Sequence, residues 1–320
     1  MSEQFIPRLF LPDYTQGNAE QKKQFSQQLG KAFNEVGFVT IANHGIDHKL
    51  IDDLYSEIQS FFALDENIKK KYEIPGLFGQ RGYTSKGKEK AKDANTPDLK
   101  EFWQCGQTVT DGDPVKDVYP ENILISESPS FNQVMIDIYA QLEHMGRQLL
   151  MAIAEYLSLP VHYFEEYVHN GNSILRALHY FPIEHPDALP EDAVRSSAHE
   201  DINLITLLIG ASADGLQVLK RDGTWFAVQA QGEDIVVNVG DMLQTLTNNV
   251  LQSTTHRVVN PPRELMGTSR YSVPFFLHPK STMSLACLDS CISAENPKAY
   301  QDITSGEYLD QRLREIGLKM

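Results

Sequence analysis

The chain has 320 residues, of which 41% are hydrophobic and 22% are charged. This composition is typical of a globular protein with a large core, and it excludes an intrinsically disordered chain. The 28 basic and 43 acidic residues give a formal net charge of −15, which argues against nucleic acid or an anionic membrane surface as a partner.

The sequence holds three cysteines, Cys105, Cys287 and Cys291. An odd count without a disulfide framework is typical of a reducing compartment. Cys287 and Cys291 could form half of a zinc site, but no second cysteine pair completes it, so ordinary thiols are expected. No apolar stretch near the first residues has signal-peptide length, and no run approaches membrane-spanning length. These features predict a cytoplasmic protein.

Two amphipathic helices with a short strand between them are expected near the amino terminus. Residues 19–36 carry apolar side chains at helical spacing, and Gly37 ends the pattern. Residues 38–41 form a short apolar strand. A turn around His44 follows, in which this histidine is expected to make structural hydrogen bonds rather than bind a metal. The second helix begins at Asp47.

The least regular stretch of the chain is 76–100. Its glycine-rich part, 79–85, lacks the Gly-Lys-Ser/Thr order of a phosphate-binding loop. Its lysine-rich part, 86–92, is most simply interpreted as a solvated loop. A lid beside a substrate site is the alternative, because long irregular loops in compact domains are often functional.

A long helix is expected at 130–157, where apolar side chains recur every three or four residues. Such a stripe packs against a sheet, and Pro160 ends the pattern. Short strands separated by turn residues then dominate. They are expected at 174–181, 198–209, 215–219, 225–228, 235–239, 242–247, 256–259 and 269–277. This series predicts a double-sheet jelly roll, and a final helix is expected at 303–316.

The pattern His199-Glu200-Asp201 is a candidate metal site. Positions i and i+2 of a strand share one face, so His199 and Asp201 can meet one ion while Glu200 points away. A third ligand from a distant strand, His256, would complete two imidazoles and one carboxylate. That set suits non-haem Fe(II), because it leaves open positions for a chelating cosubstrate and for O₂.

A second candidate is Arg270-Tyr271-Ser272, where strand alternation places Arg270 and Ser272 on one face. A guanidinium donates two parallel bonds to a carboxylate, and a hydroxyl can add a third. The flanking residues are too apolar for a solvated surface strand. The pair is therefore expected to bind a carboxylate.

Together these motifs resemble the Fe(II)/2-oxoglutarate-dependent oxygenases, and more narrowly their isopenicillin N synthase-like branch. Other similar stretches lie at 37–41, 43–46, 98–102, 199–208, 215–218 and 238–243, so the resemblance spans nearly the whole chain. It implies a mainly β fold, with a double-stranded β-helix core, an N-terminal helical region and a long supporting helix. The expected regions are 1–125 (N-terminal dioxygenase region), 126–170 (long helix), 171–282 (jelly-roll core) and 283–320 (C-terminal helical extension), which form one compact unit.

The resemblance implies that His199, Asp201 and His256 hold catalytic Fe(II), while Arg270 and Ser272 bind the far carboxylate of 2-oxoglutarate. Decarboxylation of this cosubstrate to succinate and CO₂ would drive O₂-dependent hydroxylation, desaturation or cyclisation of a small molecule. Ascorbate is the candidate reductant.

One sequence feature departs from the family pattern. Many relatives have Asn-Tyr-Tyr-Pro where this chain has His179-Tyr180-Phe181-Pro182, and Phe181 cannot donate a hydrogen bond. Tyr180 is therefore named as a further cosubstrate residue, whereas His179 is either a second one or a hydrogen-bonded core histidine.

Three alternatives stay open at this point. In isopenicillin N synthase itself the matching Arg-x-Ser holds a substrate carboxylate, so a 2-oxoglutarate-independent oxidase is the main one. A zinc hydrolase would need a general base beside the metal, and a binding protein without turnover would usually lack a ligand. The pocket is expected to include Tyr83, Phe102, Gln217, Phe276 and the final helix. Substrate identity and oligomeric state are not predicted.

Overall fold

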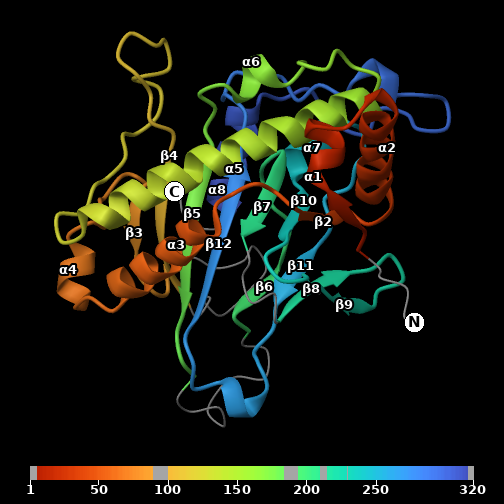
Figure 1. The fold of residues 1–320 in the computed structure, drawn as a ribbon. Helices are drawn as coiled ribbons and strands as arrows, with labels where there is room; N and C mark the ends of the chain where they lie inside the picture. The colour runs from red at the N-terminus through yellow and green to blue at the C-terminus, as the bar shows by residue number, and fades with distance from the viewer. Residues whose placement is uncertain (1–5, 89–99, 184–193, 210–214, 229, 316–320) are drawn as a thin grey trace.

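The computed structural model describes residues 6–88, 100–183, 194–209, 215–228 and 230–315. Two β-sheets face each other, and helices cover the outer side of the larger one (Figure 1). In spatial order the large sheet consists of β1 (Arg8–Phe10), β2 (Phe38–Ala42), β10 (Ile235–Val239), β7 (Ile205–Ile209), β12 (Arg270–Leu277), β5 (Ile174–Tyr180), β4 (Lys100–Gly106) and β3 (Gly82–Thr84). The small sheet consists of β6 (Ser196–His199), β11 (His256–Val258), β8 (Leu216–Leu219) and β9 (Trp225–Ala227).

The described helices lie mostly outside the two sheets. They are α1 (Leu11–Thr15), α2 (Ala19–Glu35), α3 (His48–Phe62), α4 (Glu66–Lys70), α5 (Pro129–Tyr156), α6 (Glu165–Val168), α7 (Asp241–Leu246) and α8 (Ser305–Glu315), with 3-10 turns at Arg263–Leu265 and Asp289–Cys291. None of those described combines the length and apolar character that a membrane span needs.

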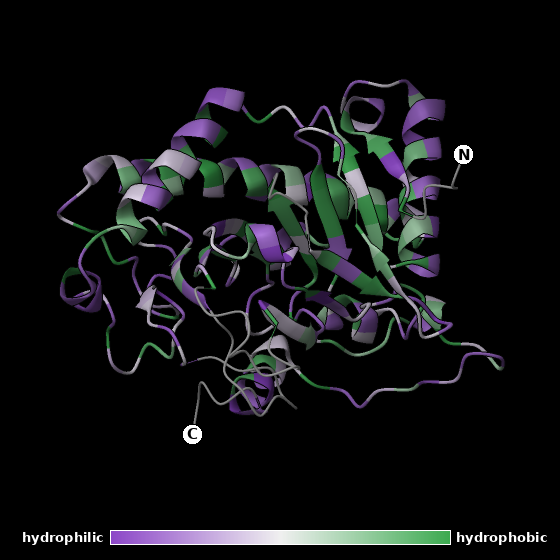
Figure 2. Cartoon of the chain, turned by 90° about the horizontal axis from the view of Figure 1, so that it is seen from below, coloured by the Kyte–Doolittle hydropathy of each residue, from purple (hydrophilic) through white to green (hydrophobic). Residues whose placement is uncertain are grey.

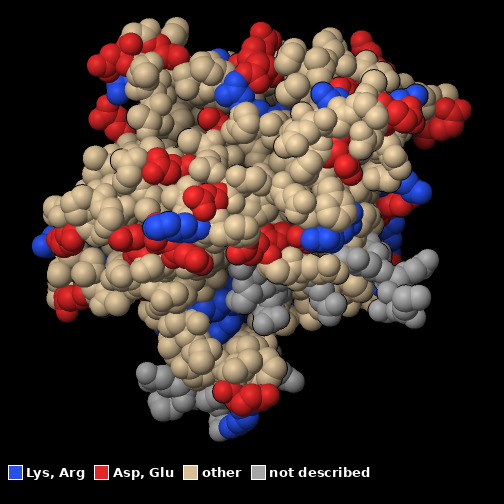
Figure 3. Space-filling view, viewed as in Figure 1, with Lys and Arg blue, Asp and Glu red and all other residues tan. Residues whose placement is uncertain are grey.

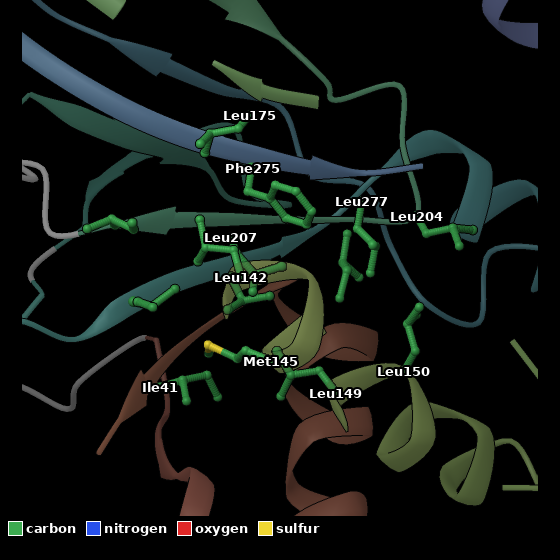
Figure 4. Close-up of a cluster of buried hydrophobic side chains, with 14 of the residues drawn as sticks. Ile41, Leu142, Met145, Leu149, Leu150, Leu175, Leu204, Leu207, Phe275 and Leu277 are labelled. Carbon is green, nitrogen blue, oxygen red and sulfur yellow. The ribbon is translucent and has the colours of Figure 1, made fainter. Parts of the chain in front are cut away.

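The long helix α5 forms the main core with the outer face of the large sheet. Ser128 caps its first turn, and Pro129 occupies a first-turn position, where the missing N–H costs nothing. Leu142, Met145 and Leu149 face the apolar side chains of β7 and β12 (Figure 4). The predicted helix at 130–157 and its packing stripe are therefore confirmed.

Alternation along β12 gives its two faces different roles. Val273, Phe275 and Leu277 join the core under α5, whereas Ser272 and Phe276 face the space between the sheets. Figure 2 shows that much of the large sheet is apolar, whereas the helices carry hydrophilic turns. One strand thus builds the core and the site together.

The amino-terminal helices pack on α5 as expected from their apolar spacing. Asn18 and Gln21 form a reciprocal capping box at the start of α2, and Asp47 caps α3. Glu155 of α5 accepts a hydrogen bond from Ser26 of α2 at 2.7 Å. The predicted helices at 19–36 and from Asp47, and the strand between them, are confirmed.

Two predicted strands were wrong. Most of 242–247 belongs to helix α7, which starts after Gly240, ends at Leu246 and buries Met242, Leu243 and Leu246. The strand at 198–209 is two strands, because β6 ends at His199 and β7 begins at Ile205. The final helix at 303–316 is confirmed as α8 within the described residues, and Ile316 lies outside them.

The large sheet also extends beyond the predicted jelly-roll strands. Strands β1 and β2 continue it beside β10, and β4 and β3 continue it beside β5. Sequence analysis missed β1, β3 and β4. Strands of the amino-terminal region and of the core therefore share one hydrogen-bonded sheet.

Candidate metal and cosubstrate site

A cavity of about 490 Å³ lies between the two sheets. Its walls come from β2, β4, β5, β7, β10 and β12 of the large sheet, from β6, β8 and β11 of the small sheet, and from α8. Pockets of this size and position bind small molecules. The three predicted metal ligands, Tyr180 and Ser272 all lie on its walls.

His199, Asp201 and His256 meet at the cavity wall. His199 ends β6 and His256 begins β11, and the two are direct partners across these antiparallel strands. Asp201 follows the end of β6, and its Oδ1 lies 3.8 Å from the Nε2 of each histidine. One ligand atom from each residue lies within 4.8 Å of the others. They form the one such group of three or more metal-ligating side chains among the described residues.

The remaining polar atoms of the three side chains are held by other groups. Nδ1 of His199 lies 2.8 Å from the Ser197 carbonyl oxygen, and Nδ1 of His256 lies 3.1 Å from that of Thr254. A carbonyl only accepts, so each Nδ1 carries the proton and each Nε2 offers its lone pair to the shared centre.

The carboxylate of Asp201 is oriented in the same way. Its Oδ2 accepts hydrogen bonds from Thr206 Oγ1 at 2.6 Å and from Asn238 Nδ2 at 2.8 Å, which leaves Oδ1 directed at the histidines. Burial opposes its ionisation, but the two histidines and these hydrogen bonds outweigh burial and lower the pKa of Asp201.

The protonation states suit a divalent metal. Burial, followed by the nearby His256, lowers the pKa of His199 to about 4, so its imidazole is neutral at pH 7. Two neutral imidazoles and one ionised carboxylate on a single face are the donor set of non-haem Fe(II) sites that leave open positions. The residues present therefore fit Fe(II).

Ser272 and Tyr180 line one end of the cavity, and Arg270 lies beside Tyr180 without being one of the lining residues. Both Arg270 and Ser272 are buried on β12, and the Arg270 guanidinium lies 5.0 Å from the centre of the Tyr180 ring. Strand register aligns Arg270 with Tyr180 and Tyr180 with Lys100 on the next strand. Ser272, Tyr180 and Lys100 all line the cavity. No sequence pattern singled out Lys100.

A further buried cation, Arg195, lies near this end. It is 4% exposed, and its Nε has no hydrogen-bond partner among the described residues. Burial lowers the pKa of Arg195, and the charge of Arg270 lowers it further. Two neighbouring guanidinium groups repel each other, and an anion bound between them would relieve this repulsion.

His179 is a core residue. Its ring nitrogens lie 2.8 Å from Glu101 Oε1 and 2.9 Å from Ser269 Oγ, and the ring stacks on Tyr271. Tyr180 faces the cavity, so its neighbour on the strand faces the other way. Of the two interpretations of His179, the structure supports the hydrogen-bonded one.

The buried carboxylate of Glu101 holds this part of the fold together. It accepts hydrogen bonds from Lys69 Nζ at 2.8 Å, from His179 and from the Tyr83 hydroxyl. Burial opposes its ionisation, but His179, Lys69 and Tyr83 together lower the pKa of Glu101.

We expect Glu101→Gln to lower the free energy of unfolding at pH 7 by about 3 kcal/mol, because Lys69 would keep a buried charge without its counter-ion. The folded-state pKa lies below the unfolded value of about 4.3, so the stabilisation is present above that pH and is lost as the pH falls through the folded pKa. Urea unfolding of both proteins at pH 7 and near pH 3 measures this. If the two proteins differed in unfolding free energy by the same amount at both pH values, Glu101 would not be the ionised partner of Lys69.

Other expectations about the pocket were partly wrong. Glu200 lines the cavity and accepts a hydrogen bond from Thr255 at 2.9 Å, and it is not part of the metal-ligating group. Phe276 and α8 line the cavity as predicted. Tyr83 instead bonds to Glu101, Phe102 lies beneath a neighbouring arginine, and Gln217 bonds to Arg257 outside the cavity.

The remaining predicted features are simpler. All three cysteines are buried and free. His44 lies in a turn and bonds to the Ile46 amide and the Glu233 carbonyl, as expected. The predicted loop at 76–100 is described up to Lys88 and again at Lys100, and residues 89–99 lie outside the described residues.

The geometry agrees with comparisons to known proteins. The family described as the 2OG-Fe(II) oxygenase superfamily matches residues 171–279, and the N-terminal family named for non-haem dioxygenase in morphine synthesis matches 6–127. A proline hydroxylase of Petromyces alliaceus, buaE, is 34% identical over 96% of this chain and 98% of its own length. The chain belongs to the 2OG-Fe(II) oxygenase superfamily.

Solved structures extend the likeness to the whole fold. A protein of the 2OG-Fe(II) oxygenase family from Caulobacter crescentus is 42% identical, with a TM-score of 0.86 over 97% of this chain and 99% of its own. A full-length protein of Neurospora crassa, solved in complex with alpha-KG, is 27% identical, with a TM-score of 0.86 over 98% of each chain. The predicted jelly-roll core with flanking helices is confirmed.

Membership of the 2OG-Fe(II) oxygenase superfamily indicates the reaction that the protein catalyses. This oxygenase requires Fe(II), 2-oxoglutarate and O₂, and it couples oxidative decarboxylation of 2-oxoglutarate to oxidation of a small molecule. A 2-oxoglutarate-dependent dioxygenase, frbA, from Dothideomycetidae is also 30% identical over 86% of this chain. These relatives do not favour the alternative oxidase that works without 2-oxoglutarate.

Proposed function

We propose that His199, Asp201 and His256 bind the Fe(II) of this oxygenase. The observation that carries the proposal is the convergence of two histidine Nε2 atoms and Asp201 Oδ1, while every other polar atom of the three side chains is held by a neighbouring group. Carbonyl acceptors fix both imidazole tautomers, and Thr206 and Asn238 fix the carboxylate.

We further propose that Arg270 and Ser272 bind the distal carboxylate of 2-oxoglutarate, with Tyr180 beside them. The buried guanidinium of Arg270 can donate two parallel bonds, and Ser272, two residues further along β12, lines the cavity. Burial strengthens these bonds, because water competes for them less than at the surface. Bound Fe(II) and 2-oxoglutarate supply the oxidising power, and the protein orients the reactants and excludes bulk water.

The substrate class follows from the cavity and from relatives. The cavity volume of about 490 Å³ accommodates small molecules rather than a folded partner. The relatives include a proline hydroxylase, and the Neurospora crassa protein has also been solved with thymine. We propose oxidation of a C–H bond in a small molecule, with hydroxylation as the outcome that the named relatives favour.

Three broader expectations also stay proposals. The regions 1–125, 126–170, 171–282 and 283–320 are inferred to form one structural unit, which the shared large sheet supports. The acidic side chains spread over the face in Figure 3 support the expectation that nucleic acid is not a partner. The three free, buried thiols support a reducing compartment such as the cytoplasm.

An anaerobic titration tests the proposed function. Fe(II)-loaded protein is titrated with 2-oxoglutarate and, separately, with 2-oxobutyrate, while the weak visible metal-to-ligand charge-transfer band is recorded. We expect 2-oxoglutarate to saturate the band at a much lower concentration, because 2-oxobutyrate keeps the chelating keto acid but lacks the distal carboxylate. Equal affinities would contradict the carboxylate site, and an absent band would contradict chelation at this metal site.

A further inference from the structure

His278 is a buried cavity residue that neither the metal site nor the cosubstrate site uses. It directly follows β12 and is 6% exposed. Its amide donates a hydrogen bond to Ser173 Oγ at 3.1 Å, and its carbonyl oxygen accepts one from the same hydroxyl at 3.3 Å. These bonds fix the backbone at a position where His278 lines the cavity.

The imidazole ring of His278 has no hydrogen-bond partner in the described part of the chain. Nδ1 is fully enclosed by the protein. Nε2 is not enclosed, and because His278 lines the cavity, this nitrogen is open to it. The buried imidazole of His179, by contrast, is bonded at both nitrogens. Buried polar groups nearly always have a partner, so an unpartnered one on a cavity wall indicates a ligand.

The ring of His278 is neutral at pH 7. Burial lowers the pKa of His278 to about 4, the carboxylate of Asp201 opposes this effect in part, and the charge of Arg81 adds to it. A neutral imidazole has one N–H donor and one lone pair. Its contact with a ligand is therefore a hydrogen bond rather than an ion pair.

The position of Arg81 favours one of the two tautomers of His278. Arg81 is 1% exposed and is not one of the residues that line the cavity, so its charge lies behind the cavity wall, on the side of the enclosed Nδ1. A lone pair is favoured beside a positive charge, whereas an N–H is disfavoured there. The proton is therefore expected on Nε2, which presents its N–H to the cavity.

Along β12, His278 and the proposed cosubstrate residue Ser272 lie on opposite sides of Phe276, which marks the position of Asp201. Thr206 donates to Asp201 at 2.6 Å and is the register partner of Phe276. Ser272 precedes Phe276 by four residues, and His278 follows it by two. A 2-oxoglutarate molecule that reaches from the metal to Ser272 therefore leaves the His278 side of the cavity to the substrate.

We propose that His278 binds the substrate by donating a hydrogen bond from Nε2 to a carbonyl oxygen, so that the enzyme oxidises a small molecule with a ketone, amide or imide group. This bond fixes one end of the substrate and thereby sets which C–H bond approaches the metal. The inference rests on the proposed function, because it requires the metal at Asp201 and the cosubstrate on the Ser272 side.

Stability measurements distinguish a ligand-binding imidazole from a structural one. Because the ring of His278 has no partner among the described residues, His278→Leu should leave the urea midpoint of the metal-free protein unchanged or raise it. His179→Leu is the matched control and should lower the midpoint, because it removes a ring that is bonded to Glu101 and Ser269. An equal fall in both variants overturns the proposal.

Matched ligand pairs test the proposed hydrogen bond without turnover. The protein is loaded with Zn(II) and 2-oxoglutarate, and ligand-observed NMR measures the dissociation constants of acetophenone, α-methylstyrene, cyclohexanone and methylenecyclohexane. In each pair a CH₂ group replaces the carbonyl oxygen. His278→Leu should weaken binding of each ketone about fivefold relative to its alkene, which is the worth of one hydrogen bond. An unchanged ratio in both pairs, or no ketone binding to the wild type, overturns the proposal.

A conservative variant and the tautomer assign the effect to Nε2. His278→Gln should keep most of the ketone preference, because its side-chain amide is also a neutral donor. Nitrogen-15 NMR of the wild type, with the His278 signals identified by their absence in His278→Gln, should show the proton on Nε2 at pH 7. A proton on Nδ1 overturns the proposed donor.

The anaerobic Fe(II) titration separates this inference from the proposed function. His278→Leu should bind 2-oxoglutarate as the wild type does. Loss of 2-oxoglutarate affinity in His278→Leu would show that His278 belongs to the cosubstrate site and would overturn the inference. A wild type that fails to bind 2-oxoglutarate would contradict the proposed function instead.

Discussion

Asp201→Ala is expected to abolish both Fe(II) binding and turnover. Asp201 supplies the one carboxylate of the triad, and its Oδ1 lies 3.8 Å from both histidine Nε2 atoms. Loss of a residue that only orients a metal ligand lowers metal affinity by about 10- to 100-fold, so loss of a ligand should cost at least roughly 100-fold. Fe(II) affinity is measured anaerobically, and turnover is measured as succinate formed from 2-oxoglutarate.

A matched control separates this effect from a general loss of stability. Asp234 is another buried carboxylate, but it pairs with Arg8 at 2.6 Å and lies outside the cavity lining. Asp234→Ala should lower stability while leaving Fe(II) affinity unchanged. The triad assignment would be wrong if Asp201→Ala kept the wild-type affinity for iron, or if Asp234→Ala lost iron to the same extent.

The metal triad was predictable because its signal is local and chemical. His199 and Asp201 are two residues apart, and His256 supplies the missing imidazole of a set that suits Fe(II). Their proximity agrees with the predicted i, i+2 spacing, although β6 itself ends at His199. Asp201 lies two residues beyond it, and its Oδ1 is 3.8 Å from the Nε2 of both histidines.

Elements with unusual local composition were the ones that sequence analysis missed. Strand β4 begins with Lys100 and Glu101, two charged residues that argue against a buried strand. Glu101 is tolerated there because Lys69 and His179, both distant in the sequence, compensate its charge. Such long-range compensation is invisible to a pattern of neighbouring residues.

Helix α7 was not missed but was predicted as a strand. Residues 242–247 are mostly apolar, and a short apolar run does not distinguish a strand from a buried helix turn. The decisive interactions are tertiary. The Asp241 amide donates to the Asp201 carbonyl at 2.7 Å, and the Met242 amide donates to that of Asn203 at 3.1 Å, so the start of α7 is fixed beside the metal triad.

Arg270→Lys is expected to raise the 2-oxoglutarate concentration needed for half-maximal activity by roughly 10- to 100-fold, because hydrogen bonds to charged groups contribute about 1.5–3 kcal/mol each. Lysine keeps the positive charge but loses the planar fork that binds both carboxylate oxygens. The rate at saturating 2-oxoglutarate should change little, since the keto acid that reacts lies at the other end of the molecule. Succinate formation at increasing 2-oxoglutarate concentration measures both quantities.

The matched control for this substitution is Arg257→Lys, which changes an arginine of the small sheet whose side chain is held by Gln217 and Trp225. It should leave the 2-oxoglutarate requirement at the wild-type value. An unchanged requirement in Arg270→Lys as well would mean that Arg270 binds something other than 2-oxoglutarate. The carboxylate of the substrate would then be the group to test at Arg270.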